Sequence, residues 1–212
     1  MKRIVIFDMD GTLIDSATDI TLSINHVRKQ HYGLAGLTEQ FVIDSINATH
    51  RNLAHLFYET DHYDEKAKAL FEEHYHIQCI QNVRVYTGIT EVLNKLHANG
   101  CILGVATNAP SPFANRMLSH LNISNYFTHV IGADNVQFPK PHPQMIEYQL
   151  ENYGFIPQYD KAWMIGDNQK DMDAAASAKI TSVFAAWGFS DSGEGDYLAT
   201  DPSQLSAIIL EE

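Results

Sequence analysis

The sequence contains very few cysteines, which limits how its fold can be held together. Of its 212 residues only two are cysteines, Cys79 and Cys101. Two cysteines cannot build a framework of several disulfides, and neither lies in a spacing typical of a metal site. A protein with reduced thiols is therefore expected, and the cytoplasm is the compartment that favours them.

Positive charge is also scarce. The chain has 14 lysines and arginines against 26 acidic residues, which gives a formal net charge of −12. A surface this acidic repels polyanions, so nucleic acids and anionic membranes are not expected partners. A small anionic ligand would need a local cation to offset the field of the whole protein.

Long apolar runs are missing as well. The first run, residues 4–7, ends at Asp8 and is too short for a signal peptide. No window approaches the roughly 18 apolar residues that a membrane-spanning helix requires. The hydrophobic content of 45% is ordinary for a globular protein, and the length suits one core with or without a smaller lobe.

The sequence does contain an alternation of strand and helix patterns. Short apolar runs predict buried strands, and the segments between them predict helices. The predicted strands are 3–7, 102–107, 129–133, 162–165 and 181–186, and the helices are 91–98, 112–121, 143–153 and 171–179. Continuous apolar runs are typical of parallel strands that helices cover on both faces. The pattern predicts an α/β fold with a Rossmann-like parallel sheet.

One interval departs from this alternation because it contains only helical patterns. Ser16 and Asp19 have the spacing of a capping box, and apolar residues follow at helical intervals. We expect a helical lobe inserted after the first strand. The predicted organisation is a core domain of residues 1–15 and 84–212 and a helical cap domain of residues 16–83.

Polar residues follow the predicted strands at their carboxyl ends, where open α/β sheets bind ligands. The sequence therefore predicts that carboxylates, a hydroxyl, an amide and a lysine converge on one edge of the sheet. These residues are Asp8 and Asp10 after the first strand, Thr107 and Asn108 at the second, Lys140 beyond the third, and Asp167 and Asp171 after the fourth.

Such a group of side chains suits phosphate chemistry with a metal ion. Carboxylates held close together need a cation, and their hard oxygens favour Mg²⁺, with Mn²⁺ as an alternative. Asp8 and Asp10 are two residues apart, so both point to the same side of an extended strand end. One carboxylate can attack phosphorus while the other moves a proton. Lys140 would offset the repulsion between these carboxylates and a phosphate.

Together these motifs resemble the four motifs of the haloacid dehalogenase superfamily. They occur in the family's order and span nearly the whole chain. The helical insert is similar to that of members whose cap follows the first strand, and residues 10–20 look most like the phosphoglycolate phosphatase-like branch. The matching segments are Asp8-x-Asp10-Gly11-Thr12, Thr107-Asn108, Lys140-Pro141 and Gly166-Asp167-x-x-x-Asp171.

The resemblance implies a magnesium-dependent phosphatase that hydrolyses a small phosphorylated metabolite through an aspartyl-phosphate intermediate. Asp8 would be the nucleophile, and Asp10 would be the general acid and base. Thr107 and Asn108 would hold phosphoryl oxygens, while Lys140 would neutralise the nucleophile and the phosphate. The implied metal ligands are Asp8, the backbone carbonyl of Asp10, Asp167 and Asp171, the last acting through water or by orienting Lys140.

The cap would determine which substrate enters. His50 and Arg51 lie in a region where the resembling branch tends to be rich in glycine, and they are candidates for substrate binding. The alternative for these two residues is a solvated helix face. Asn168 stands where the branch has serine or threonine, and Trp163 and Trp187 are interpreted as packing residues. No oligomeric state is predicted.

Other functions on the same fold stay open at this point. A sugar phosphomutase of the β-phosphoglucomutase type would use the same two acids, and a pyrophosphatase or nucleotidase is a further alternative. Thr12 favours a hydrolase, because the mutase branch has valine there. A non-catalytic binding domain is disfavoured because every acid of the motifs is present. Taken singly, Asp8, Asp10, Asp167 and Asp171 would also suit strand-end or helix caps.

Overall fold

The computed structural model describes residues 1–48, 52–190 and 192–211, and it divides into two compact units. Met1–Ile14 and Val85–Glu212 form the first unit, and Asp15–Arg84 forms the second. Two short strands, β2 (Ile14–Asp15) and β3 (Arg84–Val85), stand where the chain passes from one unit to the other, and they pair with each other.

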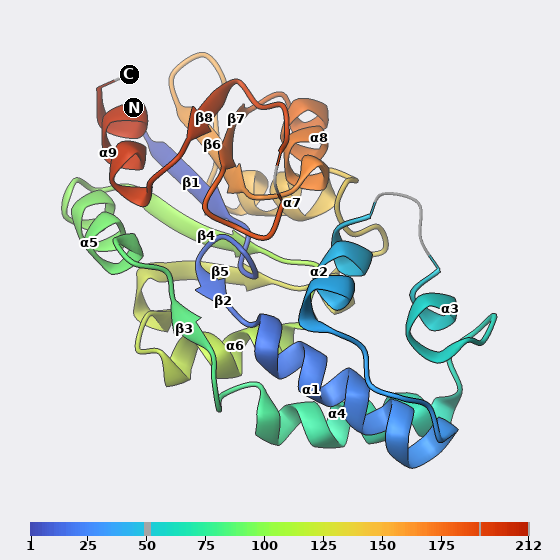
Figure 1. The fold of residues 1–212 in the computed structure, drawn as a ribbon. Coiled ribbons are helices and arrows are strands. Elements are labelled where there is room, and N and C mark those ends of the chain that lie inside the picture. The colour runs from blue at the N-terminus through green and yellow to red at the C-terminus, as the bar shows by residue number, and fades with distance from the viewer. Residues whose placement is uncertain (49–51, 191, 212) are drawn as a thin grey trace. The chain divides into compact units, whose positions relative to one another are not determined.

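The first unit is built on a sheet of six strands within the described residues, in the order β5-β4-β1-β6-β7-β8 (Figure 1). Near its centre, β1 pairs in parallel with β4 and β6. This sheet confirms the predicted α/β, Rossmann-like fold. The strands are β1 (Arg3–Phe7), β4 (Ile102–Ala106), β5 (Phe127–Ile131), β6 (Lys161–Gly166), β7 (Thr181–Ala185) and β8 (Tyr197–Ala199).

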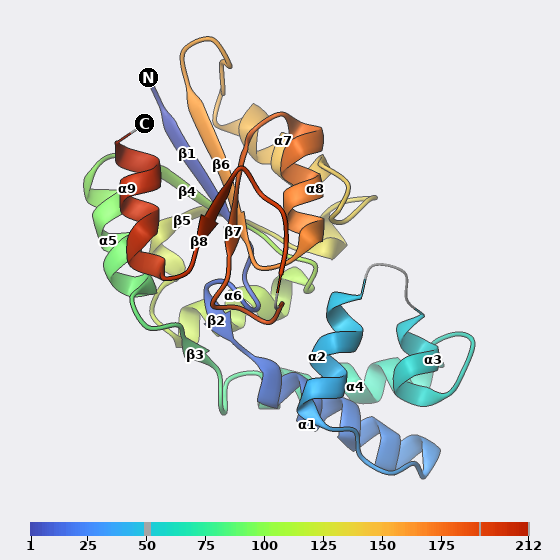
Figure 2. The same ribbon diagram turned by 45° about the horizontal axis from the view of Figure 1, so that its top comes forward.

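Helices cover both faces of this sheet, as Figure 2 shows, with α7 and α8 on one face and α5 and α9 on the other. The predicted helices of the first unit are confirmed to within two residues at each end. The helices are α5 (Ile89–Ala98), α6 (Ser111–His120), α7 (Gln144–Asn152), α8 (Gln169–Ala178) and α9 (Leu205–Leu210).

Burial on both faces explains why β1 reads as a continuous apolar run. Ile4 and Ile6 belong to the core cluster that includes Met145 and Ile146 of α7. Because side chains alternate along a strand, Val5 and Phe7 point to the opposite face. All four residues of β1 after Arg3 are 0% exposed. This buried central strand positions Asp8, the next residue, at the edge of the sheet.

The last strand and the last helix were not predicted. β8 is three residues long, and Tyr197 and Leu198 are 37% and 62% exposed at the rim of the sheet. A short edge strand with exposed side chains lacks the continuous apolar run that marks a central strand. The helix α9 has only six residues, too few to show a helical period clearly.

The second unit is helical in its described part. Its core cluster comprises Ile24, Val27, Val42, Phe57, Tyr58 and Ala67. Among the helices that the structure describes in either unit, none is both long and apolar enough to cross a membrane. The elements are α1 (Ala17–Val27), the π-helical turn η1 (Arg28–Tyr32), α2 (Glu39–Asn47), α3 (Leu53–Tyr58) and α4 (Glu65–Gln78).

The capping box predicted from Ser16 and Asp19 is wrong. Ser16 is the residue before α1, but its side chain forms no capping hydrogen bond. Asp19 is fully buried and accepts hydrogen bonds from Gln78 Nε2 (2.8 Å), Asn82 N (2.9 Å) and Asn82 Nδ2 (2.7 Å). A buried carboxylate needs such partners. The side chain of Asp19 finds them at the end of α4 and just beyond it.

Gly104 of β4 is expected to tolerate no larger residue, because a methyl group there would overlap Gln149 Oε1 and crowd the hydroxyl of Tyr153. Gln149 is buried and donates to Val105 O (3.1 Å). We predict that Gly104→Ala lowers the free energy of unfolding by about 2–4 kcal/mol through overpacking and loss of this hydrogen bond. Urea denaturation measures the change.

Gly36→Ala is the matched control for this substitution. A methyl group at Gly36 would meet Asn25 at an ordinary distance of 3.4 Å, so no loss of stability is expected there. Equal denaturation midpoints for Gly104→Ala and the wild type would contradict the packing described for β4.

Candidate active site

The predicted site residues lie at the carboxyl ends of neighbouring strands. Asp8 follows β1, Thr107 follows β4 and Asp167 follows β6, while Asp171 lies in the first turn of α8. Because β4 and β6 flank β1 in a parallel sheet, these ends share one edge. Open α/β sheets bind ligands in this position.

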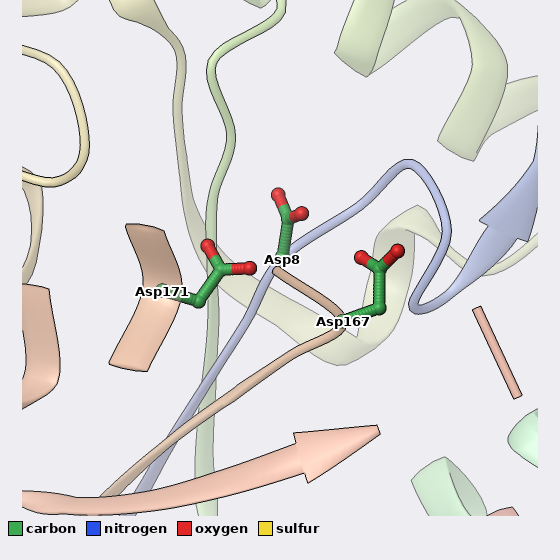
Figure 3. Close-up of side chains that lie close together, drawn as sticks. All are labelled: Asp8, Asp167 and Asp171. Atoms are coloured by element: carbon green, nitrogen blue, oxygen red, sulfur yellow. The ribbon is translucent and has the colours of Figure 1, made fainter. Parts of the chain in front are cut away.

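Three carboxylates come together at this edge. Oxygen atoms of Asp8, Asp167 and Asp171 all lie within 4.8 Å of one another. Figure 3 shows the three side chains next to each other, with Asp8 between the other two in that view. Asp167 and Asp171 are both 1% exposed. The chain thus builds a buried, oxygen-rich cluster of a kind that can hold a metal ion.

Lys140 is the cation of this cluster. Its Nζ donates to Asp8 Oδ1 (2.7 Å) and to Asp171 Oδ1 (2.6 Å), and the residue is buried. Burial by itself lowers the pKa of Lys140, but the charges of Asp171 and Asp8 outweigh burial and hold this pKa above its ordinary value. The lysine is therefore protonated throughout the physiological range.

One lysine does not compensate three carboxylates. Burial, together with the charges of Asp8 and Asp171, raises the pKa of Asp167 to about 8. Burial also raises the pKa of Asp171 to about 6, although Lys140 opposes the shift. Without a further cation, the cluster therefore retains a proton near neutral pH.

The loop after β7 holds Asp167 in place. Asp167 Oδ1 accepts from Thr12 Oγ1 (3.1 Å), and its Oδ2 accepts from the backbone N–H of Phe189 (2.7 Å). Trp187 Nε1 donates to the carbonyl of Thr12 (3.0 Å). A methyl group at Gly188 would overlap both Asp167 and Gly11 O. Residues 187–189 thus pack directly against this carboxylate and its hydrogen-bond donor.

Sequence reasoning missed this loop and assigned Trp187 to packing alone. The signal that could have revealed it is its position, because residues 187–189 follow the end of a fifth parallel strand. A search of that strand end, like the search of the first four, would have placed Trp187 and Gly188 at the site.

The start of α8 fixes Asp171. Its Oδ2 accepts from the backbone N–H of Asn168 (3.1 Å), while Asn168 Oδ1 accepts from Lys170 N (3.1 Å). This reciprocal pattern is a capping box, and a methyl group at Gly166 would overlap Asp171. Asp171 therefore caps the helix with one oxygen and binds Lys140 with the other.

The remaining predicted core residues also lie at this edge of the sheet. Thr107 is buried, and its Oγ1 accepts from Ala109 N (3.1 Å), which leaves the hydroxyl hydrogen to point elsewhere. Asn108 hydrogen-bonds the backbone of Lys140. Asp10 is half-buried beside Ile14, and its carboxylate is not one of the three that form the cluster.

The two predicted cap residues, His50 and Arg51, lie outside the described residues. The structure describes the residues on either side of this stretch, Ala48 and Asn52. Asn52 precedes α3, and its Oδ1 accepts from His55 N (3.2 Å) as a helix cap. Ala48 is the residue that follows the C-terminal end of α2.

Comparison with known proteins agrees with the arrangement of the core. The family profile of haloacid dehalogenase-like hydrolases matches residues 5–185 of this chain. The chain belongs to this family. The match confirms the resemblance drawn from the four motifs, and with it the predicted enzyme class, a hydrolase of the phosphatase type.

Two relatives and one solved structure that are similar to this haloacid dehalogenase-like protein are described as phosphoglycolate phosphatases. A phosphoglycolate phosphatase of Aquifex aeolicus is 31% identical over 98% of this chain and 96% of its own length. The phosphoglycolate phosphatase of Vibrio vulnificus strain CMCP6 is 28% identical over 98% and 96%. A crystal structure from Haemophilus somnus, described as a predicted phosphoglycolate phosphatase, superposes with a TM-score of 0.84 at 26% identity, covering 98% and 97% of the two chains.

Removal of the buried lysine is expected to destabilise the fold. In Lys140→Met the carboxylates of Asp8 and Asp171 would lose their cation, which costs about 3–5 kcal/mol for a buried pair. The loss should shrink at acidic pH, where Asp171, whose pKa is raised to about 6, takes up a proton. Chemical denaturation of the metal-free protein measures it, with the exposed Lys95→Met as a control expected to stay within about 0.5 kcal/mol. Equal losses for both variants would contradict the buried ion pairs.

The raised pKa of Asp167 predicts how stability depends on pH in the absence of metal. Between its ordinary pKa of 3.8 and about 8, the folded state holds a proton that the unfolded state has released. Stability therefore falls as pH rises, by about 1.4 kcal/mol per unit for one proton. Asparagine at this position cannot take up or release the proton. The free energy of unfolding of Asp167→Asn should therefore rise relative to that of the wild type from pH 5 to 8.

Urea titrations in EDTA at several pH values test this expectation. The exposed acid Asp173 provides the control, because Asp173→Asn should follow the wild type at every pH. A constant difference between Asp167→Asn and the wild type across the range would show that Asp167 is ionised in the folded protein.

Proposed function

We propose that this enzyme is a magnesium-dependent phosphatase that hydrolyses a small phosphate monoester through an aspartyl-phosphate intermediate. The observation that carries the proposal is the position of Asp8. Its carboxylate lies at a strand end, bonded to Lys140 at 2.7 Å and clustered with two further acids. A carboxylate held in this way can act as a nucleophile toward phosphorus.

The residues present fit a divalent metal ion. The three carboxylates are hard oxygen donors within 4.8 Å of one another, which suits Mg²⁺. Burial and the charges of neighbouring carboxylates raise the pKa values of Asp167 and Asp171, and a cation would offset those charges. In the proposed site Asp8, Asp167 and the backbone carbonyl of Asp10 would hold the metal, and Asp171 would take part through water or by orienting Lys140. A bound Mg²⁺ would neutralise charge on the phosphoryl group.

The first half of the proposed reaction transfers the phosphoryl group to the protein. A carboxylate oxygen of Asp8 attacks phosphorus in line with the ester oxygen, and the bond from phosphorus to that oxygen breaks. Asp10 donates a proton to the departing oxygen, so the alcohol leaves neutral. The product on the protein is an acyl phosphate of Asp8.

The second half releases phosphate. Asp10, now ionised, takes a proton from a water molecule, whose oxygen attacks the phosphorus. The bond between phosphorus and the Asp8 oxygen breaks, and the carboxylate is restored. The hydroxyl of Thr107 donates to a phosphoryl oxygen. Lys140 offsets the repulsion between Asp8 and the phosphate, which at ~4 Å amounts to about 4 kcal/mol per pair of unit charges at an effective dielectric of ~20.

A small substrate similar to phosphoglycolate is proposed from the relatives. Two relatives that align over 98% of this chain are phosphoglycolate phosphatases. The helical unit, Asp15–Arg84, would serve as a lid that excludes water during the reaction and opens to release product. His50 and Arg51 would contact the substrate from this lid, so Arg51→Ala should raise KM for the best substrate.

A screen of small phosphate monoesters tests the proposal directly. With Mg²⁺ present, the wild type should release inorganic phosphate from phosphoglycolate or a similar ester. Asp8→Asn should lower kcat by at least about 10³-fold, because the amide cannot form the acyl phosphate. EDTA should abolish activity, and added Mg²⁺ should restore it.

The control is Asp173→Asn, which changes an exposed acid on the same helix as Asp171 and should leave kcat unchanged. Pyrophosphate, nucleotides and sugar phosphates belong in the same screen. Full activity of Asp8→Asn would overturn the mechanism. Conversion of a sugar phosphate to its isomer without phosphate release would identify a mutase in place of a hydrolase.

A further inference from the structure

The backbone of Lys140 is held by a single side chain from another part of the chain. Lys140 lies in a loop between Pro139 and Pro141, outside the helices and strands, and is 4% exposed. Buried backbone N–H and C=O groups need hydrogen-bond partners, and a loop residue cannot take them from a ladder. The proline that follows contributes no N–H to the loop.

Asn108 supplies both partners. Its Oδ1 accepts from the N–H of Lys140 at 3.0 Å, and its Nδ2 donates to the carbonyl of the same residue at 2.9 Å. A side-chain amide carries one acceptor and one donor group side by side. It therefore pairs with Lys140 as a neighbouring β-strand residue would, across 32 positions of sequence.

This pairing fixes the point from which the lysine side chain reaches the site. Lys140 Nζ contacts Asp8 at 2.7 Å and Asp171 at 2.6 Å, so a shift of its backbone would move the ammonium away from both carboxylates. Asn108 itself follows β4 directly after Thr107, which anchors the loop to the rigid sheet.

We propose that Asn108 is a positioning residue, which acts on the phosphoryl group through Lys140 and not by direct contact. This inference rests on the proposed function for the part that concerns phosphate. The resemblance to the family implied that Asn108 holds phosphoryl oxygens. Its amide oxygen and nitrogen instead face the two backbone groups of Lys140, while the neighbouring Thr107 keeps a hydroxyl hydrogen for the phosphate.

A double-mutant cycle with inorganic phosphate as the probe separates the two roles. Calorimetry in Mg²⁺ would compare phosphate binding by the wild type, Asn108→Ala, Lys140→Met and the double variant. Asn108→Ala should weaken binding about tenfold when Lys140 is present, the scale of lost hydrogen bonds. It should cause no further loss when Lys140 is absent. Equal weakening on both backgrounds would identify a direct phosphate ligand and overturn the proposal.

Amide hydrogen exchange gives a readout that needs no phosphate. The Lys140 amide should exchange at least about tenfold faster in Asn108→Ala, because its acceptor is gone. Asn108→Asp keeps the acceptor oxygen for this amide but loses the donor to the Lys140 carbonyl, so the amide should exchange more slowly than in Asn108→Ala. Asn115→Ala removes an exposed amide of α6 that bonds Ser111 O, and it should leave the exchange unchanged. Unaltered protection in Asn108→Ala would overturn the pairing.

The two readouts also distinguish this inference from the proposed function. A wild type that binds no phosphate and hydrolyses no monoester would remove the proposed function. The exchange rates of Lys140 in the Asn108 variants would still decide whether Asn108 holds the loop.

Discussion

The site depends on the pairing of Lys140 with Asp8 and Asp171. These groups meet at 2.7 and 2.6 Å in the interior of the first unit, where an unpaired charge would cost several kcal/mol. The lysine allows acids to gather at the end of β1, but it does not neutralise them all. Burial and the charges of Asp8 and Asp171 raise the pKa of Asp167 to about 8, which makes the cluster a place for a further cation.

The charged groups are held by short segments that follow the strands. Thr12 and Phe189 bind the two oxygens of Asp167, and the helix start at Asn168 binds Asp171. Each of these donors comes from a different strand end, so the parallel sheet sets their spacing. Glycines at 11, 166 and 188 leave no space for a side chain beside the carboxylates. A site assembled from rigid elements needs little rearrangement to meet a charged ligand.

The proposed function gives the two units of the chain different tasks. The first unit carries the cluster, and the match to the hydrolase family over residues 5–185 includes residues of both units. In the proposed function this unit performs the chemistry, and the helical unit selects the substrate and excludes water. Variation between relatives in the helical unit would then change the substrate without disturbing Asp8 or Lys140.

The sequence was enough to predict the α/β fold, because the apolar runs and their intervals reflect burial on two faces of a sheet. It also located Asp8, Thr107, Asp167 and Asp171, since strand ends are readable from local pattern. The hydrogen-bond partners of the polar residues are known only from the folded chain. The contacts of Asp19 with Asn82, of Asn108 with Lys140 and of Phe189 with Asp167 join residues 22 to 63 positions apart. Such contacts follow from chain packing, which no local pattern encodes.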